Sequence, residues 1–372
     1  MPSRTSNPRS AEQAKRSPRA SSAALRRWFL SSARDFPWRP APLHARRDPY
    51  LVLVSEVMLQ QTQASRVAER ITPFLERFPT IDALAAAPQD DVLALWSGMG
   101  YYRRAIMLHR CAREVVLEHG GVFPRSAEEL RRLPGVGEYT AGAIASLCFH
   151  VRVPAIDGNV ARVLMRLEGI SLPRNDKRAT LLVRSSAASL VERSASPGLL
   201  NEALIELGAT VCTPRSPLCD RCPLRAECRA RSAGLEEKIP KPAIRPRRKT
   251  LFATVLRAVT AEGKVLIRQR PPKGLWASMW EPPTIESASE LTAASLKRGL
   301  GVGRGVRLRA CGEFVHHTTH RTIRFRVYGA EGHTDGSCGT LSSGVAGAIW
   351  VSPEGLADFA LSSPHRRILS GE

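Results

Sequence analysis

The 372-residue sequence lacks the features that define several other classes of protein. No apolar run approaches the roughly 20 residues that a membrane-spanning helix needs. The N-terminus has no apolar core followed by a small-residue cleavage site, so secretion is not expected. Eight cysteines are too few, in a chain of this length, for a disulfide scaffold. We therefore expect a soluble intracellular protein.

Acidic residues are also in short supply, since 34 Asp and Glu stand against 55 Lys and Arg. The resulting formal charge of +21 indicates a polyanionic partner, of which nucleic acid is the obvious one. Hydrophobic residues make up 43% of the chain, which is enough for packed cores and excludes a wholly disordered chain. The length suits two domains of ordinary size.

The composition changes along the chain and predicts four segments. Residues 1–24 are rich in Ser, Arg, Pro and Ala and are expected to form a disordered basic tail. Residues 25–235 carry apolar side chains at helical spacing and predict an all-α domain. Residues 236–249 have the composition of a basic, proline-rich linker. Residues 250–372 contain short β-type runs and predict a smaller α+β domain.

Four cysteines form one cluster within the loop 212–228, with the spacing C-x6-C-x2-C-x5-C. Short loops of this kind can bring four thiols to a single centre. Zinc is one interpretation, because tetrahedral thiolate ligation suits it. Ribbon-type zinc sites usually pair two C-x2-C knuckles, however, whereas a single knuckle with flanking cysteines favours an iron–sulfur cluster. The predicted ligands are Cys212, Cys219, Cys222 and Cys228.

A glycine-containing turn, LPGVGEYTAGA, lies within the helical stretch 126–146. Gly135 and Gly137 permit a tight turn between two helices, with free amides at the start of the second helix. Such amides bind phosphate without a formal charge. A plain helix–helix turn is the alternative, but the basic charge of the chain favours a DNA-binding hairpin.

Two carboxylates occupy unusual places in the sequence. Glu56 lies in the otherwise apolar run LVLVSEVML, where burial would raise its pKa and make it a general acid. Asp157 precedes a helix-like run, where a helix N-cap is the structural alternative. A proton donor beside an ionised carboxylate is the equipment for cleaving a glycosidic bond.

These motifs together resemble the MutY-type adenine DNA glycosylases of the helix-hairpin-helix superfamily, which includes endonuclease III. The resemblance runs from about Phe36 to Cys228 and continues more weakly into a Nudix-like C-terminal domain. Its motifs are FPW at 36–38, SEVMLQQTQ at 55–63, WSGMGYYRRA at 96–105, LPGVGEYTAGA at 133–143, IDGNV at 156–160, NEALIELGA at 201–209 and the four cysteines.

The resemblance implies a base-excision enzyme that flips out and hydrolyses adenine mispaired with 8-oxoguanine or guanine in double-stranded DNA. Glu56 would protonate the base, Asp157 would stabilise the oxocarbenium ion, and Tyr139 and Asn159 would support this chemistry. The family's other matching positions are the adenine pocket, at Trp38, Arg39 and Glu202, and the wedge in the base stack, at Gln61 and Tyr101.

Strand cleavage is not expected, because lyase-active relatives carry a lysine where this chain has Tyr139. No lysine lies between Lys15 and Lys177, so a Schiff base is improbable there. The resemblance further implies one [4Fe-4S] cluster, no nucleotide cofactor, no membrane partner and a monomer. It places the protein in the cytoplasm with the nucleoid in a bacterium, or in the nucleus or mitochondrion of a eukaryote.

The C-terminal domain departs from the family pattern in two ways. Residues 284–301 lack the glutamate-rich helix with which Nudix hydrolases hold magnesium. The lesion-recognition loop, Phe-Ser-His in the family, here reads Thr318-Thr319-His320 unless His316 or His317 shifts the register. We expect His320 to contact 8-oxoguanine. The alternative functions are an endonuclease III-type glycosylase for oxidised pyrimidines and a non-catalytic iron–sulfur DNA-binding protein.

Overall fold

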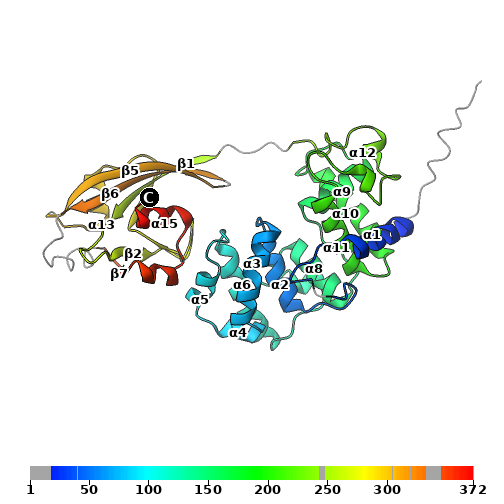
Figure 1. Ribbon diagram of the computed structural model, residues 1–372, viewed down its shortest axis with the longest axis horizontal. Helices are drawn as coiled ribbons and strands as arrows, with labels where there is room; N and C mark the ends of the chain where they lie inside the picture. The colour runs from blue at the N-terminus through cyan, green and yellow to red at the C-terminus, as the bar shows by residue number, and fades with distance from the viewer. Residues whose placement is uncertain are drawn as a thin grey trace, which may run out of the picture. The chain divides into compact units, whose positions relative to one another are not determined.

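The computed structural model describes residues 18–39, 41–242, 248–303, 305–318, 320–331 and 345–371, and Figure 1 shows their helices and strands. They form two compact units, which are described separately. The first comprises Met1–Asp82 and Arg110–Ile244, and the second combines Ala83–His109 with Arg245–Glu372. No helix of the described residues is long and apolar enough to cross a membrane.

The first unit is helical, as the apolar periodicity predicts. Two of its helices, α4 and α6, run across the boundary with the second unit. Its elements are α1 (Pro18–Ser32), α2 (Pro49–Leu59), α3 (Ala64–Arg77), α4 (Ile81–Ala86), α6 (Arg103–His119), α7 (Ala127–Leu130), α8 (Glu138–Phe149), α9 (Gly158–Glu168), α10 (Lys177–Glu192), α11 (Pro197–Thr210), η2 (Cys219–Arg221) and α12 (Arg229–Ser232).

Helix α2 lies in the interior of the first unit. Asp48 caps its N-terminus by accepting a hydrogen bond from the Tyr50 amide, and Pro49 occupies the first turn, where a missing N–H does no harm. Its residues are apolar on nearly all sides, and eight of the eleven are buried. A helix without a polar face is stable only when surrounded by protein. This position carries Glu56 into the interior.

Close glycine contacts bring α8 and α11 against the segment that leads into α9. A Cβ added at Gly142 would lie 2.4 Å from the Pro154 carbonyl oxygen, and one at Gly208 would lie 2.6 Å from the Asn159 Cβ. Such distances leave no room for a side chain, so glycine is what permits this approach. The N-terminus of α9, with Asp157, is thereby fixed between two core helices.

Two of the expected segment boundaries differ in the structure. Helix α1 begins at Pro18 and buries Leu25 and Phe29 completely, so residues 18–24 are helical rather than disordered, while residues 1–17 lie outside the described residues. The linker is also shorter than expected. Ile239 is buried in the core of the first unit and its carbonyl accepts a hydrogen bond from Arg166 Nε at 2.8 Å.

Residues 83–109 are largely helical, as expected for this part of the chain, and by their contacts they group with the second compact unit. They include α5 (Gln89–Leu95) and the following turn. Tyr102 Oη donates a hydrogen bond to the Leu361 carbonyl at 3.2 Å, and Arg366 Nη2 donates to Ser97 Oγ at 3.1 Å. These contacts across the sequence explain why the segment groups with the C-terminal residues.

The second unit is α+β, as predicted. One sheet has the strand order β4-β1-β6-β5, with β1 parallel to β6 and the other pairs antiparallel, and a smaller sheet has the order β3-β2-β7. The strands are β1 (Lys249–Arg257), β2 (Val265–Gln269), β3 (Trp280–Glu281), β4 (Thr284–Ser287), β5 (Arg307–His317), β6 (Arg321–Glu331) and β7 (Ala348–Val351), and the helical elements are α13 (Ala293–Leu300), η3 (Glu354–Asp358) and α15 (Ser363–Ser370).

Strand β1, in the interior of the larger sheet, has buried residues on both faces. Val255 on one face packs in a cluster with Ile368 of α15, whereas Leu256 on the other packs in a cluster with Leu296 and Leu300 of α13. Successive side chains of a strand point to opposite faces, so both rows of β1 are apolar.

Candidate active site

Glu56 is a buried carboxylate with almost no polar compensation. It is 9% exposed, it hydrogen-bonds with the Tyr139 side chain, and its Oε2 atom has no hydrogen-bond partner among the described residues. Burial is the largest cause that raises its pKa, from 4.5 to about 7, and the charges of Asp157 and Glu202 raise it further. Tyr139 and Arg39 oppose this rise only in part. Near neutral pH the side chain can therefore hold and release a proton.

Asp157 has the helix-capping role that the sequence analysis gave as its structural alternative. It is the N-cap of α9, where Oδ1 accepts a hydrogen bond from the Val160 amide at 2.7 Å. Oδ2 accepts a second bond from Asn159 Nδ2 at 3.0 Å. Burial raises the pKa of Asp157, while these donors oppose the rise by favouring its ionised form. Asp157 is thus better supplied with donors than Glu56, and the cap fixes its position.

A pocket joins Glu56 to most of the expected adenine-binding residues. Tyr139 comes from the first turn of α8 and Glu202 from α11, while the loop before α2 contributes Trp38 and Arg39. Trp38 stacks on Phe36 with ring centroids 4.5 Å apart. The pocket is lined by Trp38, Arg39, Arg47, Val52, Ser55, Glu56, Leu59, Tyr139, Ala143, Leu147, Ala155, Asn201, Glu202 and Ile205.

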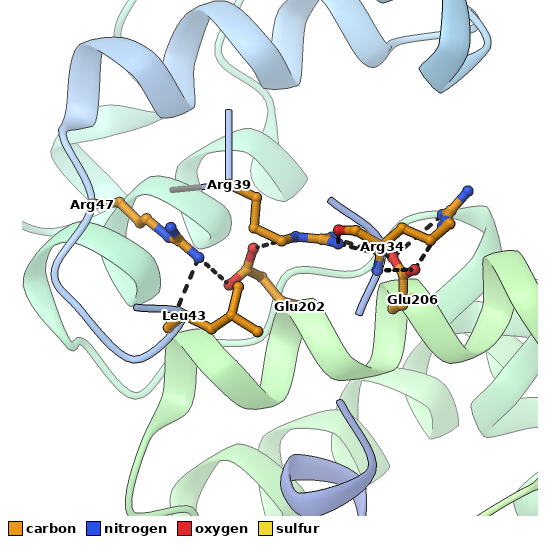
Figure 2. A network of polar contacts seen from close by, with 6 residues as sticks. All are labelled: Arg34, Arg39, Leu43, Arg47, Glu202 and Glu206. Carbon is orange, nitrogen blue, oxygen red and sulfur yellow. Dashed lines mark hydrogen bonds and ion pairs between the residues drawn. The ribbon is translucent and has the colours of Figure 1, made fainter. Parts of the chain in front are cut away.

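Three of the lining residues, Arg39, Arg47 and Glu202, belong to a row of alternating charges, shown in Figure 2. Arg47 and Arg39 donate to the two carboxylate oxygens of Glu202, and Arg39 and Arg34 both donate to Glu206. All but Arg34 are largely buried, and Glu206 is 1% exposed. The sequence analysis did not include Arg34, Arg47 or Glu206. The signal for Glu206 was present, because it is the second acid in the otherwise apolar motif NEALIELGA.

Asn201 is a further residue that the sequence analysis missed. It is 1% exposed, its Nδ2 donates to Ser146 Oγ at 2.8 Å and to the Val153 carbonyl at 3.0 Å, and its Oδ1 accepts from the Ala155 amide at 3.1 Å. These bonds hold the extended segment that precedes Asp157 against α8 and α11.

Helix α9 also contacts the start of the cysteine loop. Arg162 Nη2 donates to Asn159 Oδ1 at 2.9 Å, and its Nε donates to the Cys212 carbonyl at 2.8 Å. One turn later, Arg166 Nη1 lies 3.4 Å from Cys212 Sγ and donates to the Thr213 carbonyl at 2.7 Å. Both arginines therefore tie the start of the loop to the helix whose N-cap is Asp157.

The four loop cysteines are free and partly buried. The described residues hold no group of three or more His, Cys, Asp or Glu side chains arranged for a metal ion. Burial raises the pKa of Cys222, and the charges of Cys212, Cys228 and Cys219 raise it further, so the four thiols lie near one another. The backbone amide of Leu224 donates a hydrogen bond to Cys222, and the amides of Ala230 and Arg231 donate to Cys228. Such donors favour thiolate, which is the ligand form.

The glycine turn adopts the geometry of a helix hairpin. Ser126 caps α7 by accepting a hydrogen bond from the Glu129 amide, Gly135 has φ +76°, and Gly137 is the N-cap of α8. A Cβ at Gly137 would meet nothing within 4 Å, so the start of α8 is open at this point. Gly137 provides no side-chain hydrogen bond to the first amides of α8, and phosphate binding by these amides stays a prediction.

The two expected wedge residues share an unusual backbone conformation. Gln61, in the first unit, has φ 58°, and Tyr101, in the second, has φ 47°. Both are exposed, Tyr101 at 51%. Left-handed backbone at residues other than glycine is strained and is concentrated at functional sites.

The turn expected to recognise the lesion is partly described. Thr318 forms local bonds with Arg321, in which the Thr318 amide donates to the Arg321 carbonyl at 2.9 Å and the Arg321 amide donates to Thr318 Oγ1 at 3.1 Å. His320 is exposed, and Thr319 lies outside the described residues. The Thr318 hydroxyl thus closes the turn between β5 and β6.

The fold and this pocket define a helix-hairpin-helix base-excision protein with an attached Nudix-type unit. Family models match at three places, described as the HhH-GPD superfamily of base excision DNA repair proteins (residues 54–185), the iron–sulfur binding domain of endonuclease III (212–228) and a NUDIX domain (254–371). A solved structure of a thermostable thymine-DNA glycosylase is 28% identical, covers 58% of this chain and 97% of its own, and has a TM-score of 0.52.

Curated relatives specify the family. The adenine DNA glycosylase of Homo sapiens is 35% identical over 93% of this chain and 72% of its own length. That of Mycolicibacterium smegmatis is 43% identical over 56% of this chain and 68% of its own. The chain belongs to the adenine DNA glycosylase family, and the resemblance drawn from its motifs is confirmed. The protein is a base-excision repair enzyme. The match of residues 212–228 to an iron–sulfur binding domain favours an iron–sulfur cluster over zinc at the four cysteines.

Proposed function

We propose that the protein flips adenine out of mispairs with 8-oxoguanine or guanine and hydrolyses its glycosidic bond without cutting the strand. The observation that carries this proposal is Glu56, which lines the pocket with an unpartnered, buried Oε2 atom and has a pKa raised to about 7. A protonated carboxyl group at this place is suited to protonate a departing purine.

Asp157 supplies the second half of the chemistry. Its carboxylate is fixed by the α9 amide and by Asn159, so it can stabilise the cationic sugar that forms as the base leaves. Tyr139 positions Glu56 through their hydrogen bond. Proton donation from one side chain and charge stabilisation by the other together lower the barrier to hydrolysis.

Adenine is held by the side chains that share the pocket with Glu56. Trp38 offers a ring face, while Glu202 and Arg39 offer an acceptor and a donor to the edge of the base. Gln61 and Tyr101 enter the gap left in the DNA and offset part of the few kcal/mol that base flipping costs. The hairpin amides around Gly135 and Gly137 bind a backbone phosphate.

The strand remains intact because the position that carries lysine in lyase-active relatives is Tyr139. A phenol cannot form a Schiff base with the sugar. The product is therefore an abasic site in a continuous strand.

The cysteine loop is proposed to hold one [4Fe-4S] cluster through Cys212, Cys219, Cys222 and Cys228. The free thiols, the amide donors to Cys222 and Cys228 and the contact from Arg166 fit this group. When bound, the cluster supplies a cross-link that fixes the loop relative to α9. We further propose that the protein acts as a monomer and that His320 contacts 8-oxoguanine. Its proposed location is the cytoplasm with the nucleoid in a bacterium, or the nucleus or mitochondrion in a eukaryote.

A single-turnover assay on duplexes carrying adenine opposite 8-oxoguanine or opposite guanine tests this function. Strand breaks are scored before and after hot alkali. We expect breaks only after alkali, formed faster opposite 8-oxoguanine. Breaks before alkali would contradict the monofunctional mechanism, equal rates would contradict lesion recognition, and release from neither duplex would contradict the function itself.

A further inference from the structure

Helix α11 places two carboxylates, Glu202 and Glu206, one turn apart on the same face. Like charges at this spacing repel each other, and these two are 12% and 1% exposed. Buried carboxylates persist only when they are paired. The side chain that lies between them is Arg39, which contacts both.

The hydrogen bonds of Arg39 are divided unequally between the two carboxylates. Its Nε donates to Glu202 Oε1 at 3.2 Å, whereas Nη1 and Nη2 donate to Glu206 Oε2 at 3.3 and 3.2 Å. Nη1 also donates to the Arg34 carbonyl at 2.9 Å. Both terminal nitrogens are thus directed away from the pocket carboxylate. Glu202 receives one bond where an arginine could give two.

Other groups hold this arrangement from both ends. Arg34 Nε donates to Glu206 Oε1 at 2.6 Å, and the guanidinium of Arg39 lies 5.1 Å from the ring centre of Phe29 and 5.4 Å from that of Phe36. At the other end, Arg47 Nη2 donates to Glu202 Oε2 at 3.3 Å. Among the described residues each oxygen of Glu202 therefore has one donor, and each keeps capacity for another, because a carboxylate offers about four acceptor positions.

We propose that Glu206 is a positioning residue that holds the terminal nitrogens of Arg39 away from Glu202, so that the Glu202 carboxylate stays open to the amino group of the base. Without the negative charge at residue 206, Arg39 pairs with Glu202 through two parallel bonds, which is the preferred geometry of these groups. That pair occupies the acceptor positions that adenine needs. The inference rests on the proposed function, in which Glu202 and Arg39 contact adenine.

The test compares two DNA probes with the full-length, cluster-loaded protein. One duplex carries a non-cleavable adenine nucleotide, 2′-fluoro-2′-deoxyadenosine, opposite 8-oxoguanine, and the other carries a tetrahydrofuran abasic analogue, which has no base. We expect Glu206→Gln to weaken binding of the adenine duplex about tenfold, since a charged hydrogen-bonding arrangement in the base pocket is lost. Binding of the abasic duplex should stay unchanged.

Two controls separate positioning from folding. Arg34→Met removes the outer partner of Glu206 but leaves the Arg39–Glu206 pair, so it should change the ratio of the two affinities far less. Glu206→Asp keeps the charge and should retain most of the preference for the adenine duplex. An equal loss on both duplexes, or no loss on either, would overturn the proposal. Failure of the wild-type protein to release adenine would instead overturn the proposed function.

Discussion

Two deeply buried glutamates, Glu56 in the first unit and Glu281 in the second, have opposite surroundings. Glu281 on β3 is 1% exposed and pairs with Arg270 and with Arg268, whose Nη2 lies 3.3 Å from Oε1. Glu56 on α2 is 9% exposed, has one hydrogen bond, and leaves an oxygen without a partner among the described residues. Burial raises the pKa of both. At Glu281 the hydrogen bonds and charges of Arg270 and Arg268 oppose the rise, whereas at Glu56 the opposing groups are the Tyr139 hydrogen bond and the charge of Arg39.

The difference separates a structural carboxylate from a reactive one. Glu281, on β3, pairs with Arg268 of β2 and with Arg270, and both of its carboxylate oxygens accept hydrogen bonds from these arginines. Glu56 is held in a costly state, since a pKa of about 7 against an ordinary 4.5 corresponds to about 3 kcal/mol. Stability lost at one residue is a common feature of catalytic sites. Replacement of each glutamate by neutral glutamine should therefore have different consequences. Glu56→Gln should slow base release, whereas Glu281→Gln should destabilise the second unit.

The largest expected effect is on base release by Glu56→Gln. The amide keeps the shape of the side chain but cannot donate the proton, so the single-turnover rate should fall by at least about a hundredfold. Affinity for the mispaired duplex should change little. A variant within threefold of the wild-type rate would show that Glu56 is not the acid.

The matching change, Glu281→Gln, should leave the chemistry intact and destabilise the second unit. Removal of one partner from a buried ion pair costs about 3 kcal/mol, because Arg268 and Arg270 lose their counter-charge. Hydrogen exchange of peptides from β1 to β4 measures this opening. Unchanged protection there would mean that the pair contributes no stability.

Glu56→Gln should also stabilise the fold in a manner that depends on pH. The pKa of Glu56 is higher in the folded than in the unfolded chain, so stability is lost as pH rises from about 4.5 to about 7. The glutamine variant lacks this loss. Its advantage in free energy of unfolding should be absent below pH 4.5 and reach about 3 kcal/mol above pH 7. Denaturant titrations at pH 4.5, 6 and 8 would show whether the gap widens.

The smallest effect concerns His365, which lies 3.6 Å from Glu281. Burial lowers the pKa of His365 to about 3, so the ring is neutral, and neither ring nitrogen has a hydrogen-bond partner among the described residues. His365→Phe keeps the aromatic contact with Trp276 and removes two unsatisfied atoms. We expect a gain of about 1 kcal/mol in the free energy of unfolding. A loss of stability would show that the Glu281 site needs the imidazole.

Much of the helical unit followed from the sequence, because its motifs and its apolar periodicity are local signals. The motifs indicated that Glu56, Tyr139 and Glu202 would share a site, and the structure brings these three into one pocket. Asp157 was placed at a helix start from its neighbours alone, and it is the N-cap of α9.

What the sequence could not show depends on contacts between distant segments. Arg34, Arg39 and Arg47 meet Glu202 and Glu206 only because the loop before α2 folds against α11. The burial of Ile239, which shortens the expected linker, and the hydrogen bond from Tyr102 to Leu361 are contacts of the same kind. Composition indicated a flexible, basic segment around Ile239 without showing that this apolar side chain would pack into a core.

The most direct test of the account is the pH dependence of adenine release under single-turnover conditions, measured opposite 8-oxoguanine from pH 5.5 to 9. If protonated Glu56 is the acid, the rate should fall about tenfold for each pH unit above about 7. The residual rate of Glu56→Gln should not show this fall. A wild-type rate that stays level through pH 9 would contradict the central claim that Glu56 donates the proton.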